Sequence, residues 1–324
     1  MHLNSSFFIV IEFVKPITVV NHLENNKQLK SQLQKTLESN SKAITAELMP
    51  PRGGNPLRSL KIAQLLKDKV HAVNITDGSR AVMRMSSLAM SKLLLENEIE
   101  PIMQISCRDR NKIALQSDIL GANALGIKNI LCITGDSVKA GDQQDAKAVH
   151  EFEAVKLLKQ VQAFNEGIDP SFQKLSDEKT DLFAGAAADP SCNNLKTLRM
   201  RTIKKRESGA RFLQTQMIMD KKYLLNFCKE ISEPLELPVL AGVFLLKSYK
   251  NALFINKYVP GANIPDYILK RLEEAKDPLQ EGINIAAEQA QAYIEIAQGV
   301  HLMAVRSEHL IPEILKKAKI SLEY

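Results

Sequence analysis

The sequence predicts a single (β/α)8 barrel preceded by one extra helix. Short apolar runs alternate with longer helical patterns along most of the chain, and eight such pairs follow one another. Eight parallel strands joined by right-handed helical crossovers close into a barrel. A doubly wound open sheet is the alternative, but no GxGxxG motif follows the first strand to support it.

The pattern begins with an opening helix, NNKQLKSQLQKTLES, and the strand AITAEL. HAVNIT and PIMQIS form the next two strands, and the almost continuous apolar character of KNILCIT indicates burial on both faces. The remaining strands are the small-residue run LFAGAAA, then RFLQTQMI, LPVLAGVFLL and VHLMA. The strands are therefore expected at 43–48, 71–76, 101–106, 128–134, 182–188, 211–218, 237–246 and 300–304. The helices are expected at 26–39, 56–69, 83–97, 110–125, 148–165, 193–208, 221–231, 248–258, 279–298 and 309–318.

We expect one barrel domain over residues 26–324 and an N-terminal extension of unknown role over residues 1–25. The apolar stretch FFIVIEFVKPITVV in the extension is broken by Glu12, Lys15 and Pro16 and is too short to span a bilayer. It also lacks the basic start and small-residue cleavage site of a signal peptide. The polar segment 167–179 is expected to be a surface loop, and no low-complexity tract divides the chain.

Composition and charge narrow the function. The net charge of +6 and pI of about 9.0 favour anionic ligands, but no basic run is interleaved with aromatic residues, so we expect no nucleic-acid partner. The four cysteines form no CxxC pair, which argues against an iron–sulfur or zinc site. Cys107 and Cys132 lie in apolar strands and are expected to be core residues of a cytoplasmic protein.

Polar residues collect where the expected strands end, which is where barrel active sites lie. Asp77, Asp109 and Asp189 occupy such positions, but each could equally cap the following helix. Capping suits Glu47 poorly, because two prolines and two glycines separate it from the next helix. It does not suit Gln216 either, because that residue lies within a strand pattern.

Gly135 and Asp136 follow the strand KNILCIT and reach the same end of the barrel. Glycine there allows a ligand or another backbone to approach closely. The carboxylate of Asp136 could hydrogen-bond a ligand amide or stabilise a developing positive charge. A Gly-Asp pair after a strand is a weak signal when taken alone.

With these residues in place, the chain resembles the methylenetetrahydrofolate reductase family from about residue 43 to residue 318. The resemblance is carried by AELMPPRG, by VNITD with SRAVMRMSSLA, by QISCRDRNKIALQSDILGANALGIKNILCITGD and by FLQTQMIMD. SRAVMRMSSLA and CRDRN look most like the short, single-domain bacterial branch. The resemblance implies a flavin-carrying (β/α)8 barrel.

The resemblance also implies roles for individual residues. Glu47 would be the general acid, Gln216 would contact the folate, and Asp136 would lie near both the flavin and the pterin, with catalytic and substrate-binding roles. Cofactor contacts are implied for Thr76, Gln104, Thr134, Gly135, Asp136 and Lys205. The last of these would meet the flavin phosphates, whereas the bare charge run Lys204-Lys205-Arg206 would by itself indicate a solvated helix face.

The implied reaction is the flavin-dependent reduction of 5,10-methylenetetrahydrofolate to 5-methyltetrahydrofolate. Hydride would pass from N5 of the reduced flavin to the iminium form of the folate, in one-carbon metabolism and methionine biosynthesis. Two departures from the family pattern are visible: Gln104 replaces a histidine of some relatives, and AGAAADP lacks a tyrosine and a histidine that line the cofactor in them. FAD and FMN therefore both stay open, as do NADH, NADPH or another electron donor.

Two other classes of protein stay open. The chain could be the flavin- and folate-binding subunit of a larger electron-transfer complex, or a barrel lyase that binds Mg²⁺ at its carboxylates. We expect no resident metal, no membrane association and a homo-oligomer.

Overall fold

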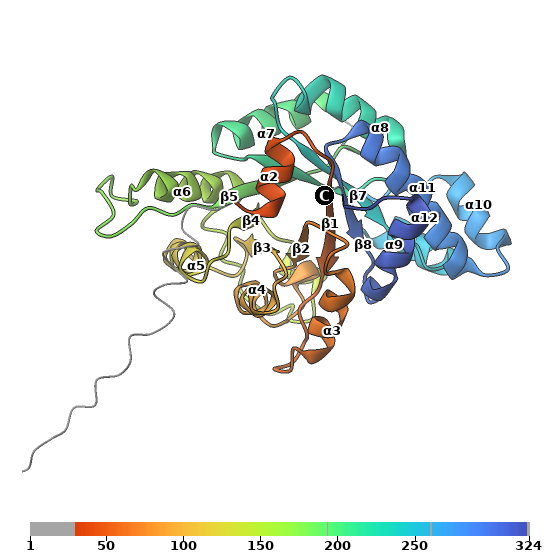
Figure 1. The fold of residues 1–324 in the computed structure, drawn as a ribbon, viewed down its shortest axis with the longest axis horizontal. Helices are drawn as coiled ribbons and strands as arrows, with labels where there is room; N and C mark the ends of the chain where they lie inside the picture. Colours follow the sequence, from red (N-terminus) through yellow and green to blue (C-terminus); the bar gives the residue numbers. More distant parts are fainter. Residues whose placement is uncertain (1–29, 193, 260, 323–324) are drawn as a thin grey trace, which may run out of the picture.

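Eight parallel strands pair in chain order, and β8 pairs with β1 to close the barrel. They are β1 (Ala43–Leu48), β2 (Ala72–Ile75), β3 (Pro101–Ser106), β4 (Asn129–Ile133), β5 (Phe183–Ala188), β6 (Phe212–Met217), β7 (Val239–Phe244) and β8 (Gly299–Met303). The structure is a computed structural model and describes residues 30–192, 194–259 and 261–322. The predicted (β/α)8 barrel is confirmed (Figure 1).

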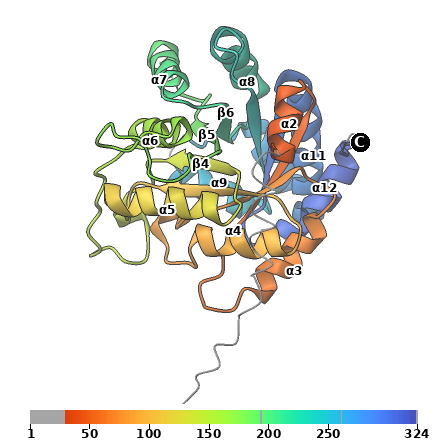
Figure 2. The same ribbon diagram turned by 60° about the vertical axis from the view of Figure 1, so that its left-hand side comes forward.

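Helices surround the strands on the outside of the barrel (Figures 1 and 2). The α-helices are α2 (Gln32–Glu38), α3 (Leu57–Leu66), α4 (Ser87–Glu96), α5 (Lys112–Ala124), α6 (Ala154–Glu166), α7 (Leu195–Glu207), α8 (Lys221–Phe227), α9 (Tyr249–Tyr258), α10 (Asp266–Glu274), α11 (Pro278–Ile296) and α12 (Ile311–Ala318). Short turns η1 (Ser79–Ala81), η2 (Val138–Ala140) and η4 (Glu308–Leu310) follow β2, β4 and β8, and the π-helical turn η3 (Cys228–Ser232) continues α8. None of the helices within the described ranges has the length and apolarity needed to cross a bilayer.

Two helix predictions were partly wrong. Residues 148–153 are not helical, because the N–H of Val149 donates to the carbonyl of Arg108 and fixes this stretch as a loop. The helix expected from residue 83 begins only at Ser87, since the side chain of Ser86 caps it. The helix α10 was not predicted; it lies in the proline-bearing stretch and packs against α9 and α11. Residues 1–25, and residues 26–29 of the first expected helix, lie outside the described residues.

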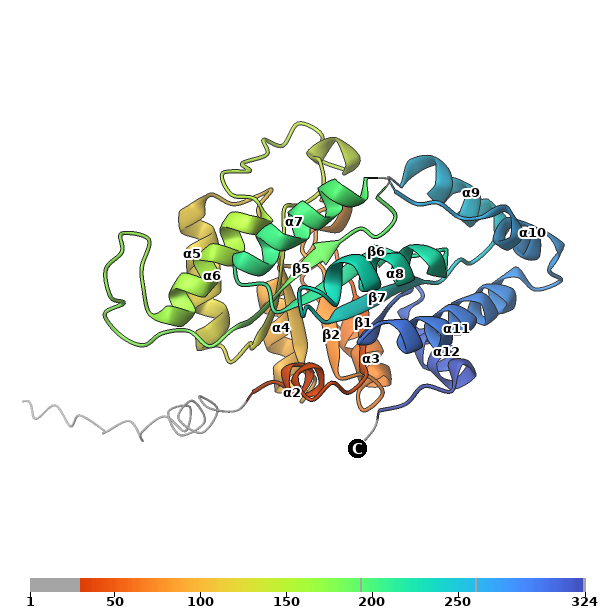
Figure 3. The ribbon, with the colours of Figure 1, turned by 90° about the horizontal axis from the view of Figure 1, so that it is seen from above.

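Side chains on the strands alternate between the barrel interior and the helices. The inward positions begin with an apolar layer that includes Ala43, Ala72, Ile102, Leu131, Phe183, Phe212 and Leu240. Leu33 and Leu37 of α2 pack on this layer and close the barrel at the amino ends of the strands, as seen at the lower edge of Figure 3. The outward strand positions, including Cys132, form the larger core beneath the helices together with Cys107, which directly follows β3.

The closure by α2 is held by the carboxylate of Glu100. It accepts hydrogen bonds from the backbone N–H groups of Gln32 and Leu33 at 2.6 and 3.0 Å, and from the side-chain amide of Asn129 at 2.8 Å. A carboxylate at a helix amino terminus satisfies donors that have no partner within the helix. The apolar layer and α2 therefore cover the barrel interior at the amino ends of the strands, and we call the opposite end, where the carboxyl ends of the strands lie, the mouth.

Candidate functional site

Glu47 lies at the mouth, four residues along β1 from the inward-facing Ala43. The alternation of the strand therefore points its side chain into the barrel. Within the described residues its carboxyl group has no hydrogen-bond partner. Burial, and then the nearby negative charge of Glu308, raise its pKa from 4.5 to about 7. A carboxyl group with this pKa can hold and release a proton near neutral pH.

The Pro-Pro turn after Glu47 is fixed by the segment that precedes α4. The guanidinium of Arg84 donates to the carbonyl of Pro50 at 2.9 Å, and the N–H of Met85 donates to the carbonyl of Pro51 at 2.9 Å. These bonds connect the loop after β1 to the loop after β2. The strand end that carries Glu47 is thus held in place by its own chain and by its neighbour.

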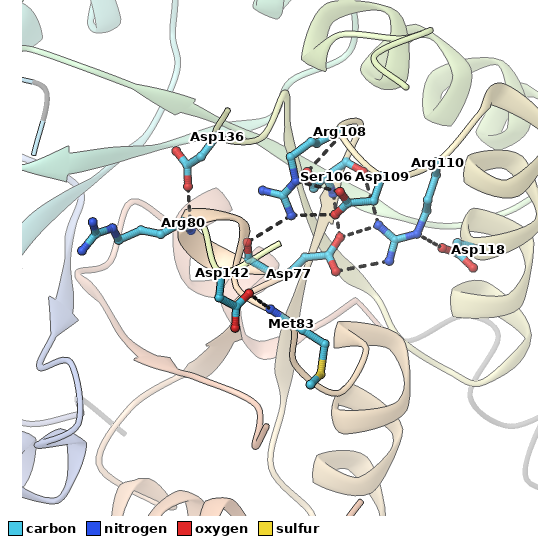
Figure 4. Close-up of polar contacts among 11 residues, drawn as sticks. Asp77, Arg80, Met83, Ser106, Arg108, Asp109, Arg110, Asp118, Asp136 and Asp142 are labelled. Atoms are coloured by element: carbon cyan, nitrogen blue, oxygen red, sulfur yellow. Dashed lines mark hydrogen bonds and ion pairs between the residues drawn. The ribbon is translucent and has the colours of Figure 1, made fainter. Parts of the chain in front are cut away.

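The loop after β4 clamps the loop after β2 with two carboxylates (Figure 4). Asp136 accepts the backbone N–H of Arg80 at 2.7 Å, and Asp142 accepts that of Met83 at 3.3 Å. Asp142 also forms an ion pair with Arg52. Arg80 has a φ of 56°, a left-handed conformation that costs energy in a residue with a side chain. Asp136 is exposed, so the part of its carboxylate that Arg80 leaves free is accessible to solvent.

None of the three aspartates for which capping was an alternative caps a helix. Asp77 is buried and forms an ion pair with Arg110 at 2.6 Å while accepting the N–H of Ser106 at 2.8 Å (Figure 4). Asp109 forms an ion pair with the neighbouring Arg108, and the carboxylate of Asp189 accepts the N–H of Ser191 in a turn. The caps of the three following helices are Ser86, Asn111 and Asn194.

Gln216 lies at the carboxyl end of β6 and is exposed. The pairing of β6 with β7 is irregular between Gln214 and Met217, and the hydroxyl of Thr215 bridges this irregularity. It donates to the carbonyl of Gln216 at 2.7 Å and accepts the N–H of Gly242 at 2.8 Å. The exposed side chain of Gln216 has no hydrogen-bond partner among the described residues.

The residues for which cofactor contacts are implied lie on β3, directly after β2 and β4, and on α7. The hydroxyl of Thr76 is fully buried and has no partner among the described residues. Gly135 has a φ of 92°, and any side chain there would collide with Ser106 and Arg108. Thr134 is exposed, with its hydroxyl accepting the N–H of Ala154 at 3.3 Å. Gln104 lies inside the barrel.

Lys205 is partly buried, unlike its exposed neighbours Lys204 and Arg206. Its ammonium group reaches the carboxyl-terminal half of β5 and donates to the carbonyl of Ala187 at 2.6 Å. Burial, and then the charge of Arg201, lower its pKa. A partly desolvated ammonium group at this position suits an anionic partner. The orphaned hydroxyl of Thr76 and this cation fit a flavin nucleotide, whereas Gly135 is needed for the close approach of Ser106 and Arg108.

Sequence reasoning missed the residues contributed by the loop after β8. Glu308 is buried, and its carboxylate accepts the N–H of Arg306 at 3.2 Å. Burial, and then the charges of Arg52 and Arg306, lower the pKa of Arg84, so three guanidinium groups gather near the mouth. The rule that barrel sites lie at strand ends would have found Glu308 if it had been applied to the eighth strand.

Comparisons with known proteins agree with this geometry. The family model described as "Methylenetetrahydrofolate reductase" matches residues 32–319. A Caenorhabditis elegans protein named "Probable methylenetetrahydrofolate reductase (NADPH)" is 22% identical over 310 residues, which cover 89% of this chain and 44% of the relative. "Methylenetetrahydrofolate reductase 2" of Schizosaccharomyces pombe is 24% identical over 304 residues, which cover 84% of this chain and 44% of the relative. The chain thus spans less than half the length of these two curated relatives.

Among solved structures, an uncharacterized Clostridium thermocellum protein that binds two copies of 5-methyl-5,6,7,8-tetrahydrofolic acid has a similar fold. The TM-score is 0.61 at 16% sequence identity, over 89% of this chain and 98% of that one. At this identity the likeness concerns the fold alone. The family model, in contrast, extends from α2 to the end of α12 and includes every residue of the candidate site described above. This chain is a member of the methylenetetrahydrofolate reductase family.

Proposed function

We propose that this protein reduces 5,10-methylenetetrahydrofolate to 5-methyltetrahydrofolate with a bound flavin. The observation that carries the proposal is Glu47: an inward-facing carboxyl group at the barrel mouth, without a hydrogen-bond partner in the described chain and with a pKa raised to about 7. The chain's family membership supports this choice of reaction.

The reaction needs a proton donor before it needs a hydride. The five-membered ring of the substrate must open to an iminium ion, and ring opening leaves charge on a weakly basic amine nitrogen. A carboxylic acid that is still protonated near neutral pH can supply that proton. Glu47 meets this requirement because its surroundings disfavour the charged form, and because the clamped Pro-Pro turn limits its motion.

Asp136 and Gln216 supply the other contacts that we propose for the substrate. Asp136 keeps a carboxylate oxygen free beside the cationic iminium, and an opposite charge at that point lowers the barrier to its formation. The exposed Gln216 amide offers both a donor and an acceptor to the pterin ring. These two residues come from β4 and β6, so they would contact the substrate from different sides.

The flavin, when bound, supplies the hydride. We propose that Thr76, Gln104, Thr134, Gly135, Asp136 and Lys205 hold it, with Lys205 directed to its phosphate groups. Neither FAD nor FMN is favoured by these residues, and NADH or NADPH is the proposed source of electrons. We place the enzyme in the cytoplasm, in one-carbon metabolism and methionine supply; its four cysteines are free thiols, as a reducing compartment requires.

Half-reactions followed by stopped-flow absorbance test the role of Glu47. Glu47→Gln should keep the reduction of the flavin by its donor, while folate-dependent flavin reoxidation slows by roughly 10²- to 10⁴-fold. Glu100→Gln is the matched control, because Glu100 is a partly buried glutamate at the end of the barrel that α2 covers. Normal folate-dependent reoxidation in Glu47→Gln would remove Glu47 from the acid role. A preparation that binds no flavin would overturn the proposed function.

A further inference from the structure

The interior of the barrel is polar one layer below the mouth. Two residues along the strands from the apolar layer of Ala43, Ala72, Ile102 and their neighbours, five of the eight inward positions hold buried polar side chains. These are Thr45, Asn74, Gln104, Gln214 and His301. Branched aliphatic side chains usually fill the interior of such barrels, and a buried polar group is costly unless it is hydrogen-bonded. A polar layer directly under a candidate site therefore suggests a role in that site.

Three of these side chains form a continuous chain of amides. The Nε2 of Gln104 donates to the Oδ1 of Asn74 at 2.9 Å, and the Nδ2 of Asn74 donates to the Oε1 of Gln214 at 2.5 Å. The strands that carry them are β3, β2 and β6, so the chain crosses the barrel from one side to the other. Asn74 is completely buried and lies in the middle.

The two ends of this chain open toward the mouth. Gln104 and Gln214 are 7% and 6% exposed, and each uses only one of its two amide groups in the chain. The two unused groups are the Oε1 of Gln104 and the Nε2 of Gln214. Neither of them is a fully buried atom without a hydrogen-bond partner in the described residues. Because α2 and the apolar layer cover the other end of the barrel, the mouth is the route by which solvent or a ligand reaches them.

Asn74 makes the two ends opposite in hydrogen-bonding character. With its single carbonyl and single NH₂ group it must accept from one glutamine and donate to the other. One end of the chain therefore presents a carbonyl oxygen to the mouth while the other presents an NH₂ group. If a ligand reversed one end, the three amides would have to reverse together.

We propose that Gln214 is a ligand-binding residue at the floor of the mouth, and that Asn74 couples its hydrogen-bonding direction to that of Gln104. This inference rests on the proposed function. The ligand chemistry that fits is a planar heterocycle with an oxo group beside a ring N–H, since an amide offers such an edge either a donor or an acceptor. Both the pterin of a folate and the ring system of a flavin carry this edge.

The test measures dissociation constants for each ligand separately. Flavin affinity is measured on folate-free protein by fluorescence quenching, and folate affinity on flavin-free protein by calorimetry with 5-methyltetrahydrofolate. Gln214→Met should weaken one ligand by roughly fivefold to tenfold, the loss expected for one hydrogen bond. The arm that shows the loss identifies whether the pterin or the flavin lies over Gln214.

A second pair of variants separates binding from packing. Gln214→Glu keeps an oxygen to accept from Asn74 and loses the NH₂ donor, so it tests the ligand contact if Gln214→Met does not fold. Asn74→Leu breaks the chain without touching either end, and it should reproduce the loss seen for Gln214→Met. Gln289→Met is the matched control, because Gln289 of α11 is a buried glutamine outside the barrel. It should leave both dissociation constants unchanged.

Each outcome decides a point. Unchanged affinity for both ligands in both Gln214 variants would overturn the binding role, and unchanged affinity in Asn74→Leu would overturn the coupling. If the protein without substitutions binds neither flavin nor folate, the proposed function falls and this inference with it. If that protein binds both ligands and only the Gln214 variants show no effect, the inference alone falls.

Discussion

The carboxyl groups of Glu47 and Glu308 are neighbours at the corner of the mouth where β1 pairs with β8, close enough that the charge of Glu308 helps to raise the pKa of Glu47. Burial is the larger cause of that rise. Glu308 is itself buried, and the backbone N–H of Arg306 binds its carboxylate. The proton on the proposed acid therefore depends on a second carboxylate that belongs to a different loop.

Removing the charge of Glu308 should shift the pH profile of folate reduction. If Glu47 is the proton donor, as proposed, turnover requires its protonated form and should fall as the pH rises through the pKa of about 7. In Glu308→Gln the carboxylate no longer raises that pKa, so the fall should occur at a lower pH. The Gln side chain can still accept the Arg306 N–H, which keeps the loop in place. An identical profile in the variant, measured by steady-state kinetics across pH, would mean that Glu308 does not act on Glu47.

The raised pKa of Glu47 should also make stability depend on pH. Between 4.5 and about 7 the folded protein holds this proton more tightly than the unfolded chain does, so the free energy of unfolding should fall as the pH rises through that window. A shift of this size corresponds to at most about 3 kcal/mol, and solvent screening reduces it. Glu47→Gln removes this effect. The free energy of unfolding of the variant minus that of the unsubstituted protein should therefore be more positive above pH 7 than below pH 4.5. Urea unfolding at both pH values measures this, with the exposed Glu207→Gln as control.

The fold was predictable because each strand is a short apolar run and each helix has a longer sequence pattern typical of helices. Both are local signals, and the closure of eight strands follows from their number. The first six residues of the helix predicted at 148–165 are not helical for the opposite reason. These residues are compatible with a helix, but the bond from Val149 to the carbonyl of Arg108 joins segments that are distant in sequence. A contact of this kind cannot be predicted from the local sequence pattern.

The residues of the candidate site also fall into two groups, those that local position predicts and those that depend on contacts between loops. Glu47 and Gln216 could be found because strand ends meet at one mouth whatever the details of packing. The inward alternation also places Gln104 inside the barrel. The partners of these residues could not be found, because they depend on which loops touch. Asp77 could have capped α4, and only the structure shows that it pairs with Arg110 from the next loop.

Asp136→Asn should separate the charge of Asp136 from its structural contact. An asparagine oxygen can still accept the Arg80 N–H, so the clamp between the two loops should persist. The lost charge should slow folate reduction by on the order of tenfold or more and shift the flavin midpoint potential. Potentiometric titration and single-turnover reoxidation measure the two effects. Asp142→Asn is the control, since Asp142 binds the same loop through Met83. Unchanged potential together with unchanged turnover would count against the proposed role.

Breaking the ion pair between Asp77 and Arg110 should lower the free energy of unfolding of the protein. Asp77 is buried, and it accepts a hydrogen bond from Ser106 at the end of β3 besides pairing with Arg110. Removing one partner of a buried pair leaves the other charge uncompensated, which costs about 3–5 kcal/mol.

Arg110→Met keeps much of the side-chain volume and removes the charge, so we expect a loss of this order in the free energy of unfolding, measured by urea titration. Lys67→Met is the control, because its partner Glu98 is highly exposed and such surface pairs contribute about 0–1 kcal/mol. Equal losses in the free energy of unfolding of the two variants would show that the buried pair of Asp77 and Arg110 contributes no more to stability than a surface pair. If only Arg110→Met is destabilised, flavin affinity should fall with it, because the loops after β2 and β3 that hold Thr76 and Ser106 are joined by this pair.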